Sequence, residues 1–191
     1  MSFAKRMKRN KVKRDIKGAL RTLKQADRAD GQVMRANIKQ ELNDMAIELT
    51  TAHNLTIIFF LAAYRVFGFA EKRLKRLIEK MGTQIECIKG GYVTVREIEQ
   101  ILAKEAHMNI EHKDIKGSHD RSIKWRVQSE MTAAFLISLL DGWGYKKIRL
   151  ERVYDEAARI ADGLTKKEFT MKDLEDLLAT EAKYRNEAMA C

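Results

Sequence analysis

Residues 56–106 and 132–182 match each other without a gap when the sequence is displaced by 76 positions. Many aligned positions carry similar side chains, including Phe67 with Trp143 and Phe69 with Tyr145. Twelve positions are identical: Thr56/Thr132, Phe59/Phe135, Gly68/Gly144, Arg73/Arg149, Leu74/Leu150, Arg76/Arg152, Thr94/Thr170, Glu99/Glu175, Leu102/Leu178, Ala103/Ala179, Glu105/Glu181 and Ala106/Ala182. Self-similarity at a fixed offset indicates a repeated structural unit. The sequence therefore predicts two copies of one module.

Proline is absent from the 191 residues, although an average usage of roughly 5% predicts about ten. Because proline is the commonest interruption of long helices, its absence favours an all-α protein. A composition of 45% apolar and 34% charged residues is typical of a folded, highly charged domain. We therefore expect a folded, all-helical chain.

Each copy of the repeat reads as three helices. The first is strongly apolar, over residues 55–67 or 131–140, and ends at a glycine between two aromatic residues. The second carries apolar residues at the i, i+3, i+4 and i+7 spacing of an amphipathic helix. The third follows a Thr-x-x-acid sequence that resembles a capping box, at Thr94 and Thr170.

The rest of the chain completes a four-part organisation. Two amphipathic segments separated by Asp30-Gly31 predict a helical hairpin ahead of the modules. A charged segment between the modules reads as a linker. We divide the chain into a basic arm with helical hairpin (1–52), a first module (53–107), a linker (108–128) and a second module (129–191).

The net charge of +10 is concentrated at the N-terminus. Residues 1–28 contain eleven bases and two acids, which leaves 26 bases and 25 acids for the other 163 residues. Such a basic arm commonly binds nucleic acid without sequence preference. The alternative is a solvated tail with no binding role. The candidate phosphate contacts here are Lys5, Arg6, Lys8, Arg9, Lys11, Lys13 and Arg14.

A second basic candidate surface follows the repeated glycines. The pattern aromatic-Gly-aromatic-x-x-x-Arg-Leu-x-Arg has the layout of a helix-turn-helix, in which the second helix reaches nucleic acid. The alternative is a solvated helix face, or arginines that pair with acids of the same chain such as Glu99 and Glu175. The candidate nucleic-acid contacts are Lys72, Arg73, Lys75, Arg76, Lys146, Lys147, Arg149 and Arg152.

The four aromatic residues beside the glycines discriminate between two kinds of binding protein. If Phe67, Phe69, Trp143 and Tyr145 are buried, they are core residues. If they are exposed, they and the adjacent arginines form a candidate protein interface.

Enzymatic chemistry finds little support in the sequence. His107, His112 and His119 lack the spacing that places metal ligands on one helical face, and we expect no metal site and no cofactor. The two cysteines form no CxxC pair, and no phosphate-cradling glycine loop is present. The longest apolar run, residues 55–64, is shorter than the about 20 residues that cross a bilayer. We expect neither a small-molecule substrate nor a membrane partner.

The segment from Phe67 to Leu74, aromatic-Gly-aromatic-x-x-x-Arg-Leu, resembles a segment of small uncharacterised proteins of bacteriophages and prophages of Gram-positive bacteria. The resemblance implies a context in which small proteins regulate transcription or replication, or disable a host protein. We expect a non-enzymatic nucleic-acid-binding protein in the bacterial cytoplasm. The alternative is a protein-interaction module that inhibits or redirects a host protein.

Overall fold

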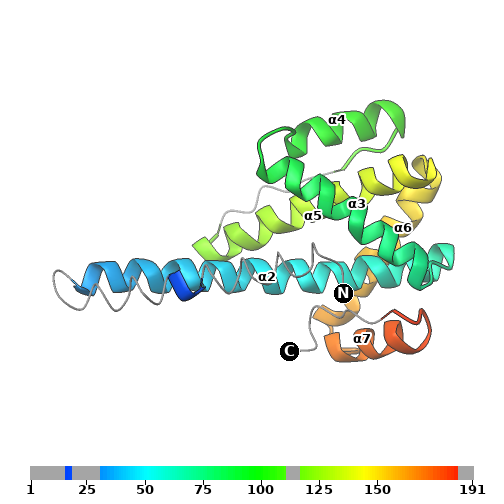
Figure 1. Ribbon diagram of the computed structural model, residues 1–191. Helices are drawn as coiled ribbons and strands as arrows, with labels where there is room; N and C mark the ends of the chain where they lie inside the picture. The colour runs from blue at the N-terminus through cyan, green and yellow to red at the C-terminus, as the bar shows by residue number, and fades with distance from the viewer. Residues whose placement is uncertain (1–15, 19–30, 111–116, 185–191) are drawn as a thin grey trace. The chain divides into compact units, whose positions relative to one another are not determined.

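The computed structural model describes residues 16–18, 31–110 and 117–184, and these residues contain helices but no strand. The expectation of an all-α protein is confirmed. Figure 1 labels the six longer helices, which are α2 (Gly31–Phe67), α3 (Glu71–Lys89), α4 (Val95–Glu105), α5 (His119–Trp143), α6 (Lys147–Thr165) and α7 (Met171–Thr180).

The chain divides into two compact units, residues 1–47 and 48–191. The first unit contains the beginning of α2, where the Gln40 side-chain amide donates a 2.9 Å hydrogen bond to Asp44. The second unit contains the rest of α2 and helices α3 to α7. Both predicted modules therefore belong to one compact unit.

Helix α2 is longer than the sequence predicted. We expected a helical hairpin to end at residue 52 and a separate apolar helix to start near residue 55, but α2 runs through without a break. No proline or glycine occurs between residues 32 and 67, so nothing in the chain interrupts the helical hydrogen bonds. The boundary at residue 52 is therefore not a helix boundary.

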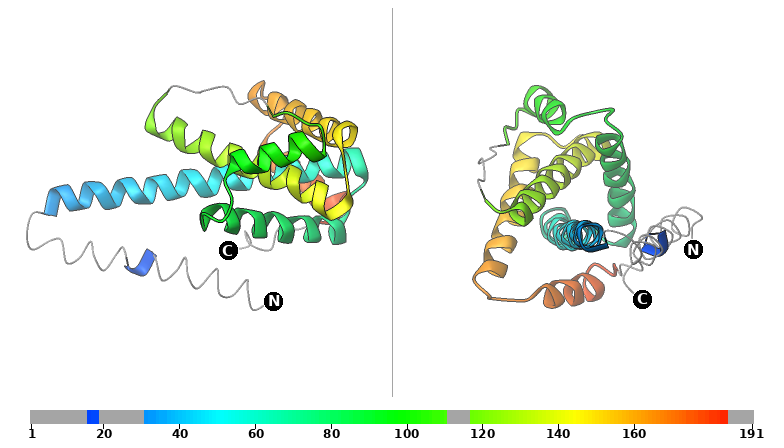
Figure 2. Two further views of the ribbon diagram at one scale, coloured as in Figure 1. Left: turned by 90° about the horizontal axis from the view of Figure 1, so that it is seen from above. Right: turned by 90° about the vertical axis from the view of Figure 1, so that its left-hand side faces the viewer.

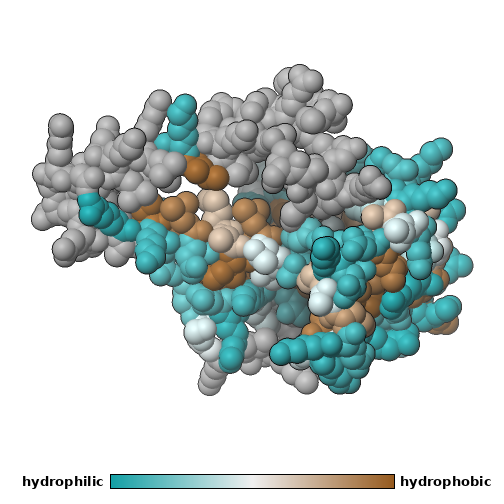
Figure 3. All heavy atoms as spheres, turned by 90° about the horizontal axis from the view of Figure 1, so that it is seen from below, coloured by the Kyte–Doolittle hydropathy of each residue, from teal (hydrophilic) through white to brown (hydrophobic). Residues whose placement is uncertain are grey.

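The length of α2 also bears on the expectation of no membrane partner, which rested on the shorter apolar run of residues 55–64. Among the described residues, α2 alone is long and apolar enough over Asn37–Phe67 to cross a membrane, by length and composition only. Leu42, Met45 and Leu49 leave apolar surface exposed on it. Figure 3 shows hydrophobic and hydrophilic residues side by side on one face of the molecule. The most apolar part of α2, residues 57–63, is buried among the helices of the second unit. That part is a core helix of the protein.

In the second unit, α2 and α5 occupy the middle, and α3 and α6 lie on opposite sides of them (Figure 2). Helices α3 and α4 both pack against α5. Tyr184, which follows α7, packs against α2. Its ring meets the ring of Phe60 edge-on, with centroids 5.1 Å apart. Each of the two central helices is thus covered by residues from the other half of the chain.

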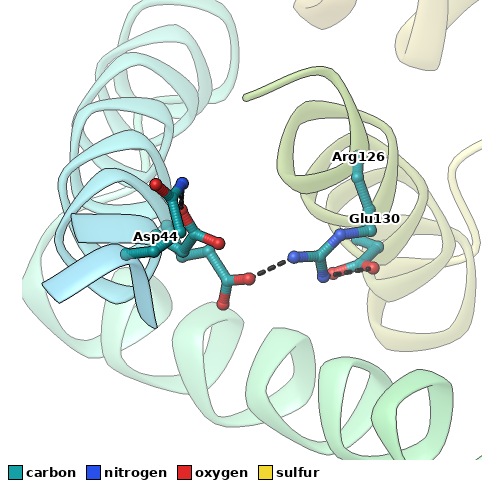
Figure 4. A network of polar contacts seen from close by, with 5 residues as sticks. Asp44, Arg126 and Glu130 are labelled. Atoms are coloured by element: carbon teal, nitrogen blue, oxygen red, sulfur yellow. Dashed lines mark hydrogen bonds and ion pairs between the residues drawn. The ribbon is translucent and has the colours of Figure 1, made fainter. Parts of the chain in front are cut away.

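A polar contact also joins the two central helices. The guanidinium of Arg126 on α5 donates hydrogen bonds to Glu48 on α2 and, at 3.4 Å, to Glu130 on its own helix (Figure 4). The bond to Glu48 raises the pKa of Arg126 above its ordinary value. The guanidinium therefore stays charged between two carboxylates.

The helices and turns correspond at the 76-residue offset found in the sequence. Helices α3 and α6 cover the same aligned positions, and α2 and α5 end at the aligned residues Phe67 and Trp143. The backbone takes a positive φ at 65° and 64° in the aligned glycines Gly68 and Gly144. Two further aligned pairs share this conformation, Gly91 with Lys167 and His107 with Lys183. Residues 76 positions apart therefore occupy corresponding places in the helices.

The segment predicted as a linker is partly helical. We placed residues 108–128 between the modules, but α5 begins at His119. Ile123 and Val127 are buried, and their spacing of four places them on the same helical face, which packs inwards. The charged residues of α5 in this segment are exposed, which is why composition alone suggested a linker; they are Asp120, Arg121, Lys124 and Arg126.

Both predicted capping boxes are present. The Thr94 hydroxyl accepts a 3.2 Å hydrogen bond from the backbone N–H of Glu97, whose carboxylate accepts a 2.7 Å bond from the backbone N–H of Thr94. Thr170 and Asp173 repeat both bonds, at 3.3 and 2.7 Å. The bonds from the threonines lower the pKa of both carboxyl groups below their ordinary values. These reciprocal bonds define the starts of α4 and α7.

Candidate functional site

Phe67, Phe69, Trp143 and Tyr145 come together in one aromatic cluster, which contains rings from both halves of the chain. The ring centroids of Phe67 and Tyr145 are 4.5 Å apart, and those of Phe69 and Trp143 are 4.9 Å apart. Phe67 lies 5.6 Å from Phe69, and Phe69 lies 6.3 Å from Tyr145. The tilted geometry and these distances are typical of stabilising aromatic pairs.

The two glycine turns place these rings. Gly68 and Gly144 adopt positive φ, a conformation that costs other residues more because their Cβ atoms clash with the backbone. After each glycine the chain turns back, and the N–H groups of Phe69 and Tyr145 donate 3.4 Å hydrogen bonds to Ala63 and Leu139. The rings before and after each glycine consequently point into the same region.

The cluster is neither wholly buried nor wholly exposed. Phe69 is completely buried, whereas Phe67, Trp143 and Tyr145 are half-buried. The four rings are therefore neither all buried nor all exposed, so neither condition set from the sequence is met in full. Phe69 is a core residue, and the other three rings reach the surface beside it.

Three arginines lie over the rings of the cluster, and we call them the arginine rim: Arg73, Arg76 and Arg149. Their guanidinium carbons are 5.6 Å from the Phe69 centroid, 5.3 Å from Trp143 and 4.9 Å from Tyr145, respectively. All three side chains are exposed. A cation over an aromatic face at such a site contributes about 0.5–1 kcal/mol, so the rings hold the guanidinium groups in place.

The rim arginines have no carboxylate partner among residues 31–110 and 117–184. One alternative from the sequence was that the repeated arginines pair with repeated acids such as Glu175, but that carboxylate lies 2.8 Å from the Nε2 atom of His53 instead. Neighbouring lysines differ, since Lys75 pairs with Glu71 and Lys147 lies 3.9 Å from Glu151. The charge of the rim is therefore not neutralised within the described part of the chain.

The remaining predicted contacts fall into two groups. Lys72, Lys146 and Arg152 are exposed on the same two helix starts as the rim. The arm residues Lys5, Arg6, Lys8, Arg9, Lys11, Lys13 and Arg14 lie outside the described residues.

Sequence reasoning missed one surface residue near the rim. Gly144, Lys146, Lys147, Ile148 and Arg149 line a shallow depression, and Ile148 is 74% exposed. The aligned residue in the first half is Lys72, so this exposed isoleucine differs between the halves. That difference was visible in the repeat.

The spacing of the rim excludes one geometry that the helix-turn-helix interpretation of the sequence allowed. Dimeric helix-turn-helix proteins place their two recognition helices about 34 Å apart, in successive major grooves. Here Arg73 and Arg149 are connected by the 5.6 Å contact to Phe69, the 6.3 Å contact to Tyr145 and the 4.9 Å contact back to Arg149. These distances together fall well short of that spacing. The starts of α3 and α6 are too close for docking into two successive grooves.

A metal centre is not apparent in the described residues, which contain no group of three or more His, Cys, Asp or Glu side chains placed to hold an ion. Of the three histidines considered as ligands, His107 and His119 are exposed, and His112 lies outside the described residues.

The fold and the cluster define an all-α protein in which arginines from two corresponding helices surround a shared group of aromatic rings. No protein-family model, no curated protein and no solved structure matches the chain.

Proposed function

We propose that the protein binds nucleic acid through the arginine rim and acts by binding, not by catalysis. The observation that carries this proposal is that three exposed guanidinium groups from two helices lie over one aromatic cluster without carboxylate partners among the described residues. Phosphate groups are the partners that such a set of uncompensated guanidinium groups suits.

An arginine that is stacked on an aromatic ring is well suited to bind phosphate. The N–H donors of a guanidinium lie in its plane, so a group whose face covers a ring retains donors at its edge for phosphate oxygens. The ring also restricts the side chain before it binds, which lowers the conformational entropy lost on binding. The rim is thus partly organised for phosphates in advance.

In this proposal the chain consists of a basic arm with a helical hairpin, followed by two copies of a three-helix module. Lys72, Lys146 and Arg152 extend the charge beside the rim, and the arm adds sequence-independent affinity. The resemblance to bacteriophage proteins makes a regulatory or replication-associated role in the bacterial cytoplasm part of the same proposal.

The test compares charge reversal in the rim with matched reversal elsewhere. The rim variant is Arg73→Glu with Arg149→Glu, and the control is Arg96→Glu with Lys172→Glu, which changes the same charge at exposed, aligned positions of α4 and α7. Binding of fluorescent duplex DNA and RNA is measured between about 50 and about 200 mM salt. We expect the rim variant to lose at least about tenfold in affinity and to flatten the salt slope by about two.

Two outcomes contradict this proposal. One is the absence of binding to any nucleic acid at low salt. The other is an equal loss in the rim and control variants, which would mean that only the overall charge matters.

A second candidate function is binding to a host protein. The half-buried Phe67, Trp143 and Tyr145 beside arginines have the composition of a protein-interaction hot spot. In that case Trp143→Ala abolishes capture of a bacterial protein that survives nuclease digestion, whereas nucleic-acid affinity stays unchanged.

A further inference from the structure

Contacts between aligned residues indicate an approximate two-fold axis in the second unit. Phe59 stacks on its aligned partner Phe135, with ring centroids 4.4 Å apart and planes 4° apart. Phe69 likewise contacts its own aligned partner, Tyr145. Contacts of a position with its own counterpart occur where a two-fold axis passes. The two ring pairs therefore mark an axis that runs from the core to the aromatic cluster.

Two further pairs of contacts in the cluster follow the same relation, whereas the contact of Arg76 with Trp143 has no counterpart between Arg152 and Phe67 in the described residues. Exchange of the halves converts the Phe67–Tyr145 pair into the Trp143–Phe69 pair, and both pairs are observed, at 4.5 and 4.9 Å. The same exchange converts Arg73 over Phe69 into Arg149 over Tyr145, and both of these contacts are observed too. Arg73 and Arg149 thus lie on opposite sides of the axis.

The arginines are also the basic residues that the two halves share along these helices. Within α3 and α6, a basic residue occurs at the same aligned position in both halves only at Arg73/Arg149 and Arg76/Arg152. The neighbouring bases differ, since Lys72 aligns with Ile148 and Lys75 with Glu151. Within these two helices, only the aligned arginines therefore place positive charge at positions that the axis relates.

Duplex nucleic acid has a matching symmetry. Its two strands are antiparallel, so their phosphate backbones are related by two-fold axes that pass through the grooves at right angles to the helix, whereas a single strand has no such axis. Protein dimers use this match when their symmetry mirrors that of a duplex site. A symmetric pair of arginines accordingly suits two phosphates on opposite strands.

We propose that the arginine rim binds double-stranded nucleic acid across one groove, with Arg73 and Arg149 contacting phosphates of opposite strands. This inference rests on the proposed function. The short chain of contacts between the two arginines suits a single groove, about 6 Å or about 12 Å wide in B-form DNA, and not two successive grooves. Because backbone symmetry recurs along any duplex, this contact requires no particular base sequence.

The experiment uses the full chain, a short duplex and each of its two single strands. Binding of all three is measured at the same salt concentration with wild type, Arg73→Glu, Arg149→Glu and the control Arg96→Glu. We expect at least about tenfold tighter binding to the duplex, since only the duplex supplies two strands to the rim. Arg73→Glu and Arg149→Glu are expected to lower duplex affinity by the same factor within about twofold, and Arg96→Glu by less.

Lysine variants distinguish a loss of binding charge from a loss of the fold. Arg73→Lys and Arg149→Lys keep the charge but lack the planar guanidinium, so they are expected to recover part of the affinity that the glutamate variants lose. Equal binding to single strand and duplex overturns the inference, as does an effect of Arg73→Glu without one of Arg149→Glu, while the proposed function survives both results. Absence of binding to all three probes overturns the proposed function as well.

Discussion

The rings of Phe59 and Phe135 lie face to face, with centroids 4.4 Å apart and planes 4° apart. Phe59 belongs to α2 and Phe135 to α5, and the two residues are 76 positions apart in the chain. Both are buried. The two central helices therefore meet at corresponding residues, and the two halves of the second unit share one core.

The shared core predicts that these two phenylalanines act as a pair. Truncation of a buried phenylalanine typically costs about 3–5 kcal/mol, and we expect both Phe59→Ala and Phe135→Ala to lower the free energy of unfolding by such an amount. The double variant should lose less than the sum, because either single change removes the same stacking contact. Urea unfolding measures all three, and Tyr92→Ala, at an 86% exposed position, is the control. Strict additivity would show that the stacked pair contributes nothing of its own.

A buried carboxylate joins α6 to α2 and predicts unequal roles for two arginines. Glu156 is 8% exposed and lies 3.1 Å from Arg65 and 2.5 Å from Arg159. The Arg159 side chain is 76% exposed, so water replaces its contact more readily than that of Arg65. We expect Arg65→Ala to lower the free energy of unfolding by about 1.5–3 kcal/mol and Arg159→Ala by less. A larger loss in Arg159→Ala, measured by the same unfolding assay, would contradict the assignment.

Ser138 predicts a stabilising substitution. Its hydroxyl is fully buried on α5 and has no hydrogen-bond partner among the described residues. The aligned residue in α2 is Ala62, which is also fully buried. We expect Ser138→Ala to raise the free energy of unfolding by about 1 kcal/mol, because it removes an unsatisfied polar group. Ala62→Ser is the reciprocal change and should be destabilising. Thermal unfolding tests both, and destabilisation by Ser138→Ala would refute the prediction.

The two capping boxes predict a dependence of stability on pH. Hydrogen bonds from Thr94 and Thr170 lower the pKa of Glu97 and Asp173 in the folded state. A lowered folded pKa means that the stabilisation is complete above the ordinary pKa values, 4.5 for Glu97 and 3.8 for Asp173, and is lost as the pH falls through the folded values. We therefore expect Glu97→Ala with Asp173→Ala to be destabilising at neutral pH and to approach wild type in acid.

The control for this pH prediction is Glu79→Ala with Asp155→Ala. These are exposed, aligned acids on α3 and α6, outside the capping boxes. Urea midpoints are measured at several pH values for the three proteins. A difference between the capping-box variant and wild type that stays constant into acid would show that the carboxylates do not act through their charged forms.

Elements determined by short stretches of chain were predicted well. The ends of α2 and α5 at the glycines, and the starts of α4 and α7 at Thr94 and Thr170, follow from turn and capping chemistry within a few residues. Two of the predicted boundaries, at residues 52 and 128, fall inside continuous helices and were drawn from changes in composition. Composition changes along a continuous helix because one part faces water and another packs into a core, so it does not mark where a helix ends.

The candidate site was only partly predictable. The sequence identified Phe67, Phe69, Trp143 and Tyr145 and the arginines that follow them, but it placed each set in its own module. That the rings interleave, and that Arg76 from one half lies over Trp143 from the other, depends on packing between distant segments. The local sequence of either half does not specify which aromatic residue of the other half its own aromatic residues contact.

The sequence by itself determined the helices, their turns and the 76-residue correspondence, because helical periodicity, glycine turns and capping boxes operate through neighbouring residues. Only the tertiary structure decided that corresponding residues meet, and that Arg73 and Arg149 consequently lie on one surface. The physical reason is that burial of Phe59 against Phe135 removes apolar surface from both halves at once, and such a contact exists only when segments far apart in the chain are brought together.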